Sequence, residues 1–281
     1  MKPVRLALAV AARFRAWSET LAHDLRFGAR ILRKSPGFAI TTILTLSLGI
    51  AAAVAIFGFV DSALLQPLPY PNSSRLMGVF ETSRQSGERM GYSFHNYLDM
   101  DRANRVFSPT AAFDSSKDFV LSDREGAHEV NAVGVTGKFF QILGVSPILG
   151  EVFAPDSASE DLLAQPSTVI LSYAAWQTWF GGSPDVLGKT VTLSGESYTV
   201  IGVLPRSFKF ARTGATEFWT TLRPFAGDTC KLSRGCATMG VIATLKDAVT
   251  VQHALADVQA IAGREAKEHP DPDKNRSANV T

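Results

Sequence analysis

The stretch PGFAITTILTLSLGIAAAVAIFGFV, residues 36–60, decides how this chain is organised. It runs for 25 residues without a charged side chain. About 20 helical residues cross a hydrocarbon core of roughly 30 Å, and lipid offers an isolated segment no hydrogen-bond partners in any other conformation. The sequence therefore predicts a transmembrane helix, which the apolar residues that follow extend to residue 65. The alternative is a buried helix of a soluble protein, but such helices are rarely apolar on every side over this length.

Basic residues gather on one side of this apolar run. Residues 1–34 carry eight Lys or Arg side chains against two acidic ones, whereas the flank after the run begins with Asp61 and has no basic residue before Arg75. Lys and Arg next to a membrane span mark its cytoplasmic side. We therefore predict a single-pass protein of the cell inner (plasma) membrane, with a cytoplasmic N-terminus and its main domain in the periplasm or outside the cell. A basic segment beside a bilayer favours anionic lipid headgroups over nucleic acid as its partner.

The N-terminal segment, residues 1–35, has the pattern of a cytoplasmic amphipathic helix. Apolar residues recur at helical spacing over 21–32, and arginines occupy another face. This pattern is typical of a helix that lies on a membrane surface. For residues 1–15 a partly disordered basic tail is the alternative. A cleaved signal peptide is a further alternative, but the leader before residue 36 is longer than signal peptides allow.

Beyond the anchor, strand and helix patterns alternate along residues 66–281. Short apolar or alternating runs predict strands over 75–80, 109–113, 117–122, 128–137, 167–172, 216–222 and 239–246, and a hairpin over 187–205. Apolar residues at helical spacing predict helices over 93–105, 138–145, 173–182 and 247–269, and residues 154–166 have the composition of a polar loop. The predicted fold class is α+β, with an amphipathic helix and one transmembrane helix followed by a mixed α/β domain large enough to bury a core.

No pattern in the chain specifies a reaction. The five histidines are scattered along the chain: His23, His95, His128, His253 and His269. No G-x-S-x-G element of a hydrolase is present either. The stretch GSPDVLGKT, residues 182–190, resembles a phosphate-binding Walker A loop, but it has five residues between its glycines instead of four and precedes a strand pattern instead of a helix. We therefore expect a protein that is not an enzyme, with no catalytic residue, no cofactor and no metal site.

The two cysteines, Cys230 and Cys236, lie in CKLSRGC on the predicted outer side. An oxidising compartment permits a disulfide there, and the five intervening residues make a loop that a disulfide can close. Cys230 and Cys236 are therefore the candidate disulfide, with two free thiols as the alternative. A metal site is not expected at these positions, because no histidine or third cysteine stands at ligand spacing.

The string DLRFGARILRKSPGFAITTILTLSLGIAAAVAIFGFVDSALLQPLPYPNSSRL, residues 24–76, resembles the opening of the MacB/FtsX-type ABC transporter permeases, in particular their ADOP branch. The motifs that carry the resemblance are the D-L-R-x-x-x-R lead at 24–30, S-P-G-F at 35–38, the L-G-I-x-A middle at 48–52 and L-L-x-P-L-P-Y-P at 64–71. Further matches lie at 135–153, 169–205 and 241–262, so that the resemblance covers about residues 21–275.

The resemblance implies a MacB-like periplasmic core domain over residues 66–281, divided into a porter-like part and an inserted lobe at about 145–230. It also implies a cytoplasmic ABC ATPase subunit as partner, a second permease copy in a dimer, and no catalytic residue. In such permeases three further membrane helices follow. The chain stops at Thr281, so this C-terminal permease domain is expected to be absent and the chain is expected to be a fragment.

Two hypotheses for function follow from the sequence. In the first, the chain is a non-catalytic, permease-like membrane subunit that couples motion in the membrane to an outer surface. In the second, it is a single-span module whose outer domain binds a ligand or partner without transport. An anchored extracytoplasmic enzyme is a third hypothesis, which the lack of a catalytic constellation disfavours.

Overall fold

The computed structural model of the chain describes residues 30, 33–60, 70–71, 73–114, 118–123, 126–155, 162–210, 215–223, 230–270 and 276–281. The predicted amphipathic segment, residues 1–35, lies almost wholly outside these residues, as does the end of the predicted anchor at 61–65. The chain divides into two compact units, Met1–Pro67 and Leu68–Thr281, and each is described by itself.

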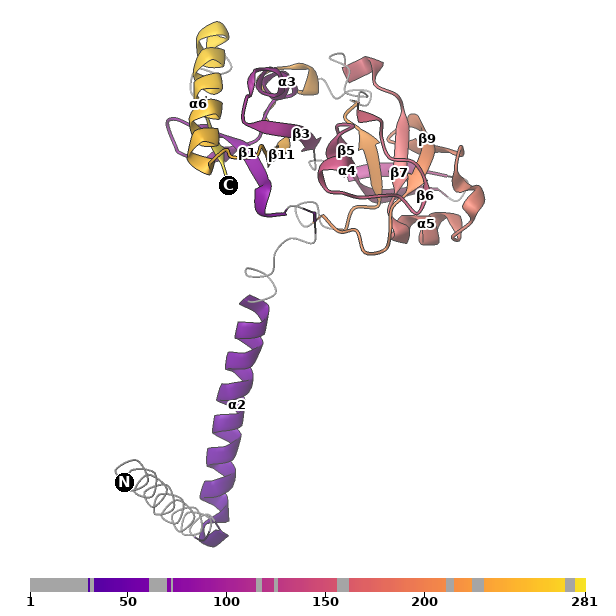
Figure 1. Ribbon diagram of the computed structural model, residues 1–281. Coiled ribbons are helices and arrows are strands. Elements are labelled where there is room, and N and C mark those ends of the chain that lie inside the picture. The colour runs from indigo at the N-terminus through magenta and orange to yellow at the C-terminus, as the bar shows by residue number, and fades with distance from the viewer. Residues whose placement is uncertain are drawn as a thin grey trace, which may run out of the picture. The chain divides into compact units, whose positions relative to one another are not determined.

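In the first unit the predicted apolar helix is present as α2 (Pro36–Val60), drawn as one unbroken helix in Figure 1. The hydroxyl groups of Thr42 and Thr45 donate hydrogen bonds to carbonyl oxygens four residues earlier, so these polar side chains are satisfied within the helix. No part of the stretch Pro36–Gly58 is buried, and Phe57 is 75% exposed. Length and composition allow this helix to cross a membrane, and its exposure distinguishes it from the buried core helix of a soluble protein.

The second unit alternates strands with short helices, which confirms the predicted α+β class. Its helices are α3 (Phe94–Ala103), α4 (Phe139–Ile142), α5 (Tyr173–Phe180) and α6 (Val251–Glu268). Its strands are β1 (Leu76–Ser83), β2 (Arg89–Met90), β3 (Phe107–Asp114), β4 (Asp118–Ser122), β5 (Ala127–Val135), β6 (Leu149–Gly150), β7 (Thr168–Leu171), β8 (Thr190–Leu193), β9 (Glu196–Val203), β10 (Phe218–Thr221), β11 (Gly240–Leu245) and β12 (Arg276–Val280). Each strand and helix predicted for this unit is present.

One half of the sheet is antiparallel, in the order β3–β11–β1–β12. Helices α3 and α6 pack on one face of it and α4 on the other (Figure 1). Successive side chains of a strand point to opposite faces, and β11 shows this directly. Val241 and Ala243 join the buried cluster that contains α3 and α6, whereas Ile242 joins the cluster that contains α4. This half of the sheet therefore has a buried apolar cluster on each of its two faces.

The other half closes on itself. Strand β10 pairs with β7 and, in parallel, with β5, and the pairings β7–β9, β9–β8, β8–β4 and β4–β5 complete a ring of six strands. The alternate side chains of these strands form one buried cluster, which includes Leu121, Leu171, Leu193 and Phe218. Closure pairs the edges of the strands, which protects them from pairing with other chains.

The predicted inserted lobe at about 145–230 stays a prediction. The six-strand ring also requires β4 and β5, which precede residue 145. As a packing unit the ring therefore begins upstream of the predicted boundary. Only the three-dimensional pairing of β5 with β10 shows this, because nothing local in β4 or β5 marks them as part of a later lobe.

Local chemistry explains the turns and ends of these elements. Ser194 and Gly195 have φ angles of 49° and 83°, as the two-residue turn of the predicted β8–β9 hairpin requires. Helix α3, predicted over 93–105, begins after Ser93, whose hydroxyl accepts the Asn96 N–H. Helix α6 begins four residues later than the predicted residue 247, because the hydroxyl of Thr250 caps it. Strand β12 and the two-residue strands β2 and β6 were not predicted.

Candidate functional site

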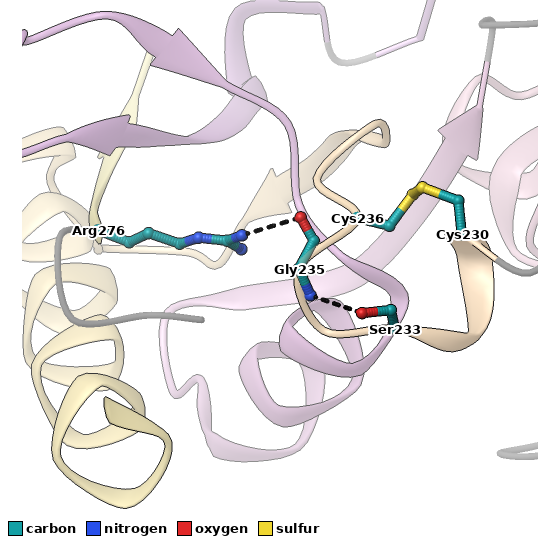
Figure 2. Close-up of a disulfide and its surroundings, with 5 residues drawn as sticks. All are labelled: Cys230, Ser233, Gly235, Cys236 and Arg276. Carbon is teal, nitrogen blue, oxygen red and sulfur yellow. Dashed lines mark hydrogen bonds between the residues drawn. A yellow bond between two sulfur atoms is a disulfide. The ribbon is translucent and has the colours of Figure 1, made fainter. Parts of the chain in front are cut away.

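Cys230 and Cys236 close a short loop at the surface of the second unit (Figure 2). Their sulfur atoms are joined and their Cα atoms lie 5.4 Å apart, within the range that a disulfide spans. The hydroxyl of Ser233 accepts a hydrogen bond from the N–H of Gly235, which shapes the loop between them. Cys236 is buried, whereas Leu232 is exposed. The disulfide in the mature protein remains a prediction that mass analysis tests.

The loop takes part in a circuit of polar contacts, which we call the polar circuit: Glu81, Asn96, Arg234, Gly235 and Arg276. The Asn96 amide donates to Oε1 of Glu81 at 2.9 Å, and Arg276 donates to Oε2 of Glu81 at 2.9 Å. Arg234 donates to Oδ1 of Asn96 at 2.8 Å, and Arg276 donates from its second nitrogen to the Gly235 carbonyl at 3.3 Å. Figure 2 shows the contact between Arg276 and Gly235 beside the disulfide.

The polar circuit joins four parts of the chain that are distant in sequence. Glu81 lies in β1, Asn96 in α3, Arg276 in β12, and Arg234 in the disulfide loop. Glu81, Asn96 and Arg276 are buried, and buried charges are tolerated when they are paired and hydrogen-bonded. The arrangement holds these elements together and offers no nucleophile next to a base. Sequence reasoning missed it, because its members carry no local pattern.

The chain enters the second unit through a second set of contacts, at Tyr70 and Pro71. The Tyr70 hydroxyl donates to the backbone carbonyl of Lys209 at 2.6 Å, and its ring packs against the cluster that contains α4. Burial raises the pKa of Tyr70, so the hydroxyl remains a donor. Pro71 lies against Gly144, where an added Cβ would stand 2.5 Å from Pro71 Cγ. These two contacts hold the entering chain against the second unit.

A groove of about 840 Å³ opens beside the Lys209 contact. Its walls come from the start of α5, from the turn after β9 and from the residues that lead into β10. The lining residues are Ser172, Tyr173, Ala174, Gln177, Thr178, Leu204, Pro205, Arg206, Phe208, Lys209, Phe210, Ala215, Thr216, Glu217 and Trp219. Backbone hydrogen bonds of 2.8 Å from Ser172 to Glu217 and from Leu204 to Leu171 tie these walls together.

Aromatic rings form the floor of the groove. The Trp219 ring lies 5.5 Å from that of Phe208 and 6.4 Å from that of Phe210, measured between centroids. Trp219 and Phe210 are buried in the cluster that also contains Phe139 and Phe140, which makes the floor continuous with the core. Phe139, Phe140 and Phe210 are therefore buried packing residues, whereas Phe208 is only partly buried.

Other residues that the sequence singled out are not brought together. Of the described histidines, His95 lies in α3, His128 in β5 and His253 in α6, with His269 at the end of α6. No group of three potential metal ligands occurs among the described residues. The stretch 182–190 forms a 3-10 turn at Pro184–Val186 and then enters β8, which confirms the predicted turn followed by a strand.

The solved structures that share this fold include three transporter-related domains. The periplasmic region of MacB from Actinobacillus actinomycetemcomitans is 16% identical, with 74% of this chain and 88% of that chain covered and a TM-score of 0.52. A domain of a protein described as a permease, from Porphyromonas gingivalis, is 15% identical, with 75% and 92% covered and a TM-score of 0.53. The extracellular domain of the noncanonic ABC-type transporter YknZ from Gram-positive bacteria is 16% identical, with 73% and 99% covered and a TM-score of 0.51.

No curated protein matches the chain. A family model does match it: that of the MacB-like periplasmic core domain, over residues 39–261. The match begins inside α2, continues through both halves of the sheet and ends inside α6. The predicted relationship to MacB/FtsX-type permeases is thereby confirmed, and the chain belongs to the MacB-like periplasmic core domain family.

Proposed function

We propose that the chain is a non-catalytic, membrane-anchored subunit of an ABC-type export or mechanotransmission system. In this proposal α2 crosses the inner membrane once, the N-terminus is cytoplasmic, and Leu68–Thr281 is extracytoplasmic. The family match, the apolar length of α2 and the basic residues before it support the proposal. The cysteine pair fits it as well, because disulfides persist in oxidising compartments.

The observation that carries the coupling role is the attachment of the entering chain. Tyr70 and Pro71 contact the region of Lys209 and Gly144, and Arg75 donates to the Leu245 carbonyl at 2.9 Å, at the end of β11. A displacement of the chain that enters the unit therefore acts on both halves of the sheet. Rigid, packed elements pass on such displacements with little loss, because protein interiors are close-packed.

Two partners belong to the proposal. A cytoplasmic ABC ATPase subunit would supply the motion, and a second permease copy would complete a dimer. Family membership is the support for both. The anionic lipid of the inner leaflet is the third expected contact, with the basic segment before α2.

A single-span binding module without transport is the second candidate function. The open, aromatic-floored groove favours it, because small-molecule sites are concave and mainly apolar. The two candidates differ in their need for an ATPase, which makes the partner the discriminating measurement.

The test uses the full chain in its native membrane. A reporter enzyme active only outside the cytoplasm, inserted into the full chain after residue 72, should be active, and the same reporter inserted after residue 34 should be inactive. The full chain should also co-purify with an ABC ATPase whose hydrolysis rate changes when Gly144→Ala disturbs the Pro71 contact. The reverse reporter pattern would contradict the orientation. Correct topology without an ATPase partner would favour the binding module.

A further inference from the structure

We propose that the groove binds a single-chain amphiphile with an anionic headgroup, such as a medium-chain fatty acid. The alkyl tail of the ligand lies on the aromatic floor, and its anionic headgroup contacts Arg206 and Lys209. This inference goes beyond the permease role and does not depend on an ATPase partner.

The size and lining of the groove select a small apolar ligand. Its volume of about 840 Å³ lies within the roughly 300–1,000 Å³ of small-molecule sites, and most of its lining is apolar. Phe208 provides the accessible apolar face of the floor, because Trp219 and Leu204, which also line the groove, are only 2% and 1% exposed. Flexible alkyl chains bind such surfaces by removing apolar area from water.

The charges at the groove select an anion. Arg206 and Lys209 lie on the turn after β9, are exposed, and make no ion pair within the described part of the chain. Glu217 is the one acidic lining residue, and both of its carboxylate oxygens are occupied. Oε1 accepts from the Trp179 indole and Oε2 from the Asn131 N–H, each at 3.1 Å. The two cations are therefore available to a ligand carboxylate.

An apolar surface beside two available cations is complementary to one end-charged chain. A neutral apolar molecule would leave Arg206 and Lys209 unused, and a cationic amphiphile would be repelled by them. The carbonyl of Lys209 is held by Tyr70, so the turn that bears both cations is fixed before any ligand arrives. A pre-formed turn limits the entropy lost on binding.

Photolabelling of the full chain tests the proposal. The protein is placed in nanodiscs of zwitterionic lipid, exposed to decanoate that carries a terminal diazirine, irradiated and digested. Mass spectrometry should find the label on the described lining residues, at 172–174, 177–178, 204–206, 208–210, 215–217 and 219. Unlabelled decanoate should compete about tenfold better than decyltrimethylammonium, and shortening it by two methylenes should weaken competition about fifteenfold.

Variants separate charge from shape. Arg206→Glu with Lys209→Glu should reduce labelling about tenfold, whereas Lys189→Glu, which makes one such charge reversal outside the groove on the same half, should not. Thr178→Trp, at an exposed position on the α5 wall, should block labelling without touching the core. Circular dichroism of each variant verifies that it is folded, and because Thr178 lies outside the core, this variant keeps the test informative if the double variant fails to fold.

The proposal would be overturned by label spread evenly over the second unit, by equal competition from the cationic amphiphile, or by unchanged labelling in both groove variants. Loss of labelling at high protein concentration would assign the groove to a second copy of this chain instead and would also overturn it. The reporter measurement and co-purification of an ATPase with the unaltered chain do not involve the groove, so failure here is distinguishable from failure of the permease proposal.

Discussion

Arg276 of β12 donates a hydrogen bond to Glu81 of β1 at 2.9 Å, although 195 residues separate them in sequence. Their side chains are 8% and 1% exposed. Because β12 is the last strand of the described chain, this ion pair fixes the end of the second unit to its first strand. The pair also connects to the disulfide loop through the Gly235 carbonyl.

The first prediction concerns this ion pair. Arg276→Met leaves the Glu81 carboxylate buried without its cation, which should lower the free energy of unfolding of residues 68–281 by about 3–5 kcal/mol. Arg276→Met combined with Glu81→Met should lower it less, because no unpaired charge remains. Urea unfolding measures both. Asp247→Asn is the control, since Asp247 is 98% exposed and its ion pair with Arg75 should contribute less than about 1 kcal/mol. A double variant less stable than the single one would contradict this explanation.

The second prediction concerns the disulfide. Non-reducing mass analysis should show the loss of two hydrogens, and Cys230→Ser with Cys236→Ser should lower the free energy of unfolding by about 2 kcal/mol, as expected for a loop this short. Hydrogen exchange should increase at Arg234 and Gly235, and with them at Arg276, because the loop holds two contacts of the polar circuit. Two free thiols in the mature protein would remove the bridge from this account.

The third prediction concerns the chain that enters the second unit. Gly144 and Gly181 have nearly equal φ angles, 62° and 61°, but an added Cβ meets Pro71 at 2.5 Å only at Gly144 and open space at Gly181. Replacing either by Ala therefore imposes the same backbone strain, about 1 kcal/mol. Gly144→Ala alone should also displace Pro71 and increase proteolysis near Tyr70. Equal proteolysis of the two variants would show that Pro71 is not held by this contact.

The fourth prediction concerns alkaline pH. Burial, with Asp101 as a smaller cause, raises the pKa of Tyr97 to about 12, and burial also raises that of Tyr92. In the unfolded chain these tyrosines lose their protons near pH 10, before the folded protein does. The stability that the raised pKa values contribute is therefore complete below about pH 10 and is lost as pH rises towards 12. Each tyrosine should contribute a slope of about 1.4 kcal/mol per pH unit in that range.

Urea midpoints measured across this range provide the check, together with ultraviolet titration of tyrosinate. Tyr97→Phe should make the decline shallower, because it removes one of the two groups that titrate in this range. A slope unchanged by Tyr97→Phe would mean that Tyr97 is not the group whose proton is retained.

Local patterns were sufficient for most elements of this fold. Ser93 and Gly181 mark the start of α3 and the end of α5 through hydrogen bonds and a φ angle that the sequence chemistry specifies. The hairpin turn at Ser194 and Gly195 is equally local. The start of α6 was misplaced because Asp247 and Thr250 are both residue types that cap helices, and only the structure shows that Thr250 does so.

Strand β12, which the sequence did not predict, and the groove both arise from contacts between distant parts of the chain. β12 reads RSANV, which has too little apolar alternation to predict a strand, and it forms because β1 offers a free edge to Val280 and Ala278. The groove depends on Phe208, Trp219 and Thr178 meeting from three elements. No local pattern in the sequence marks these three positions as neighbours, so the groove could not be predicted from it.

By itself, the sequence determined the apolar helix, the charge asymmetry around it, the α+β class and the family, because each depends on the identity of residues close together in the chain. The tertiary structure alone decided the six-strand ring, the polar circuit and the groove. These depend on pairings such as β5 with β10 and Glu81 with Arg276, and the energy of such contacts exists only after distant segments have been brought together.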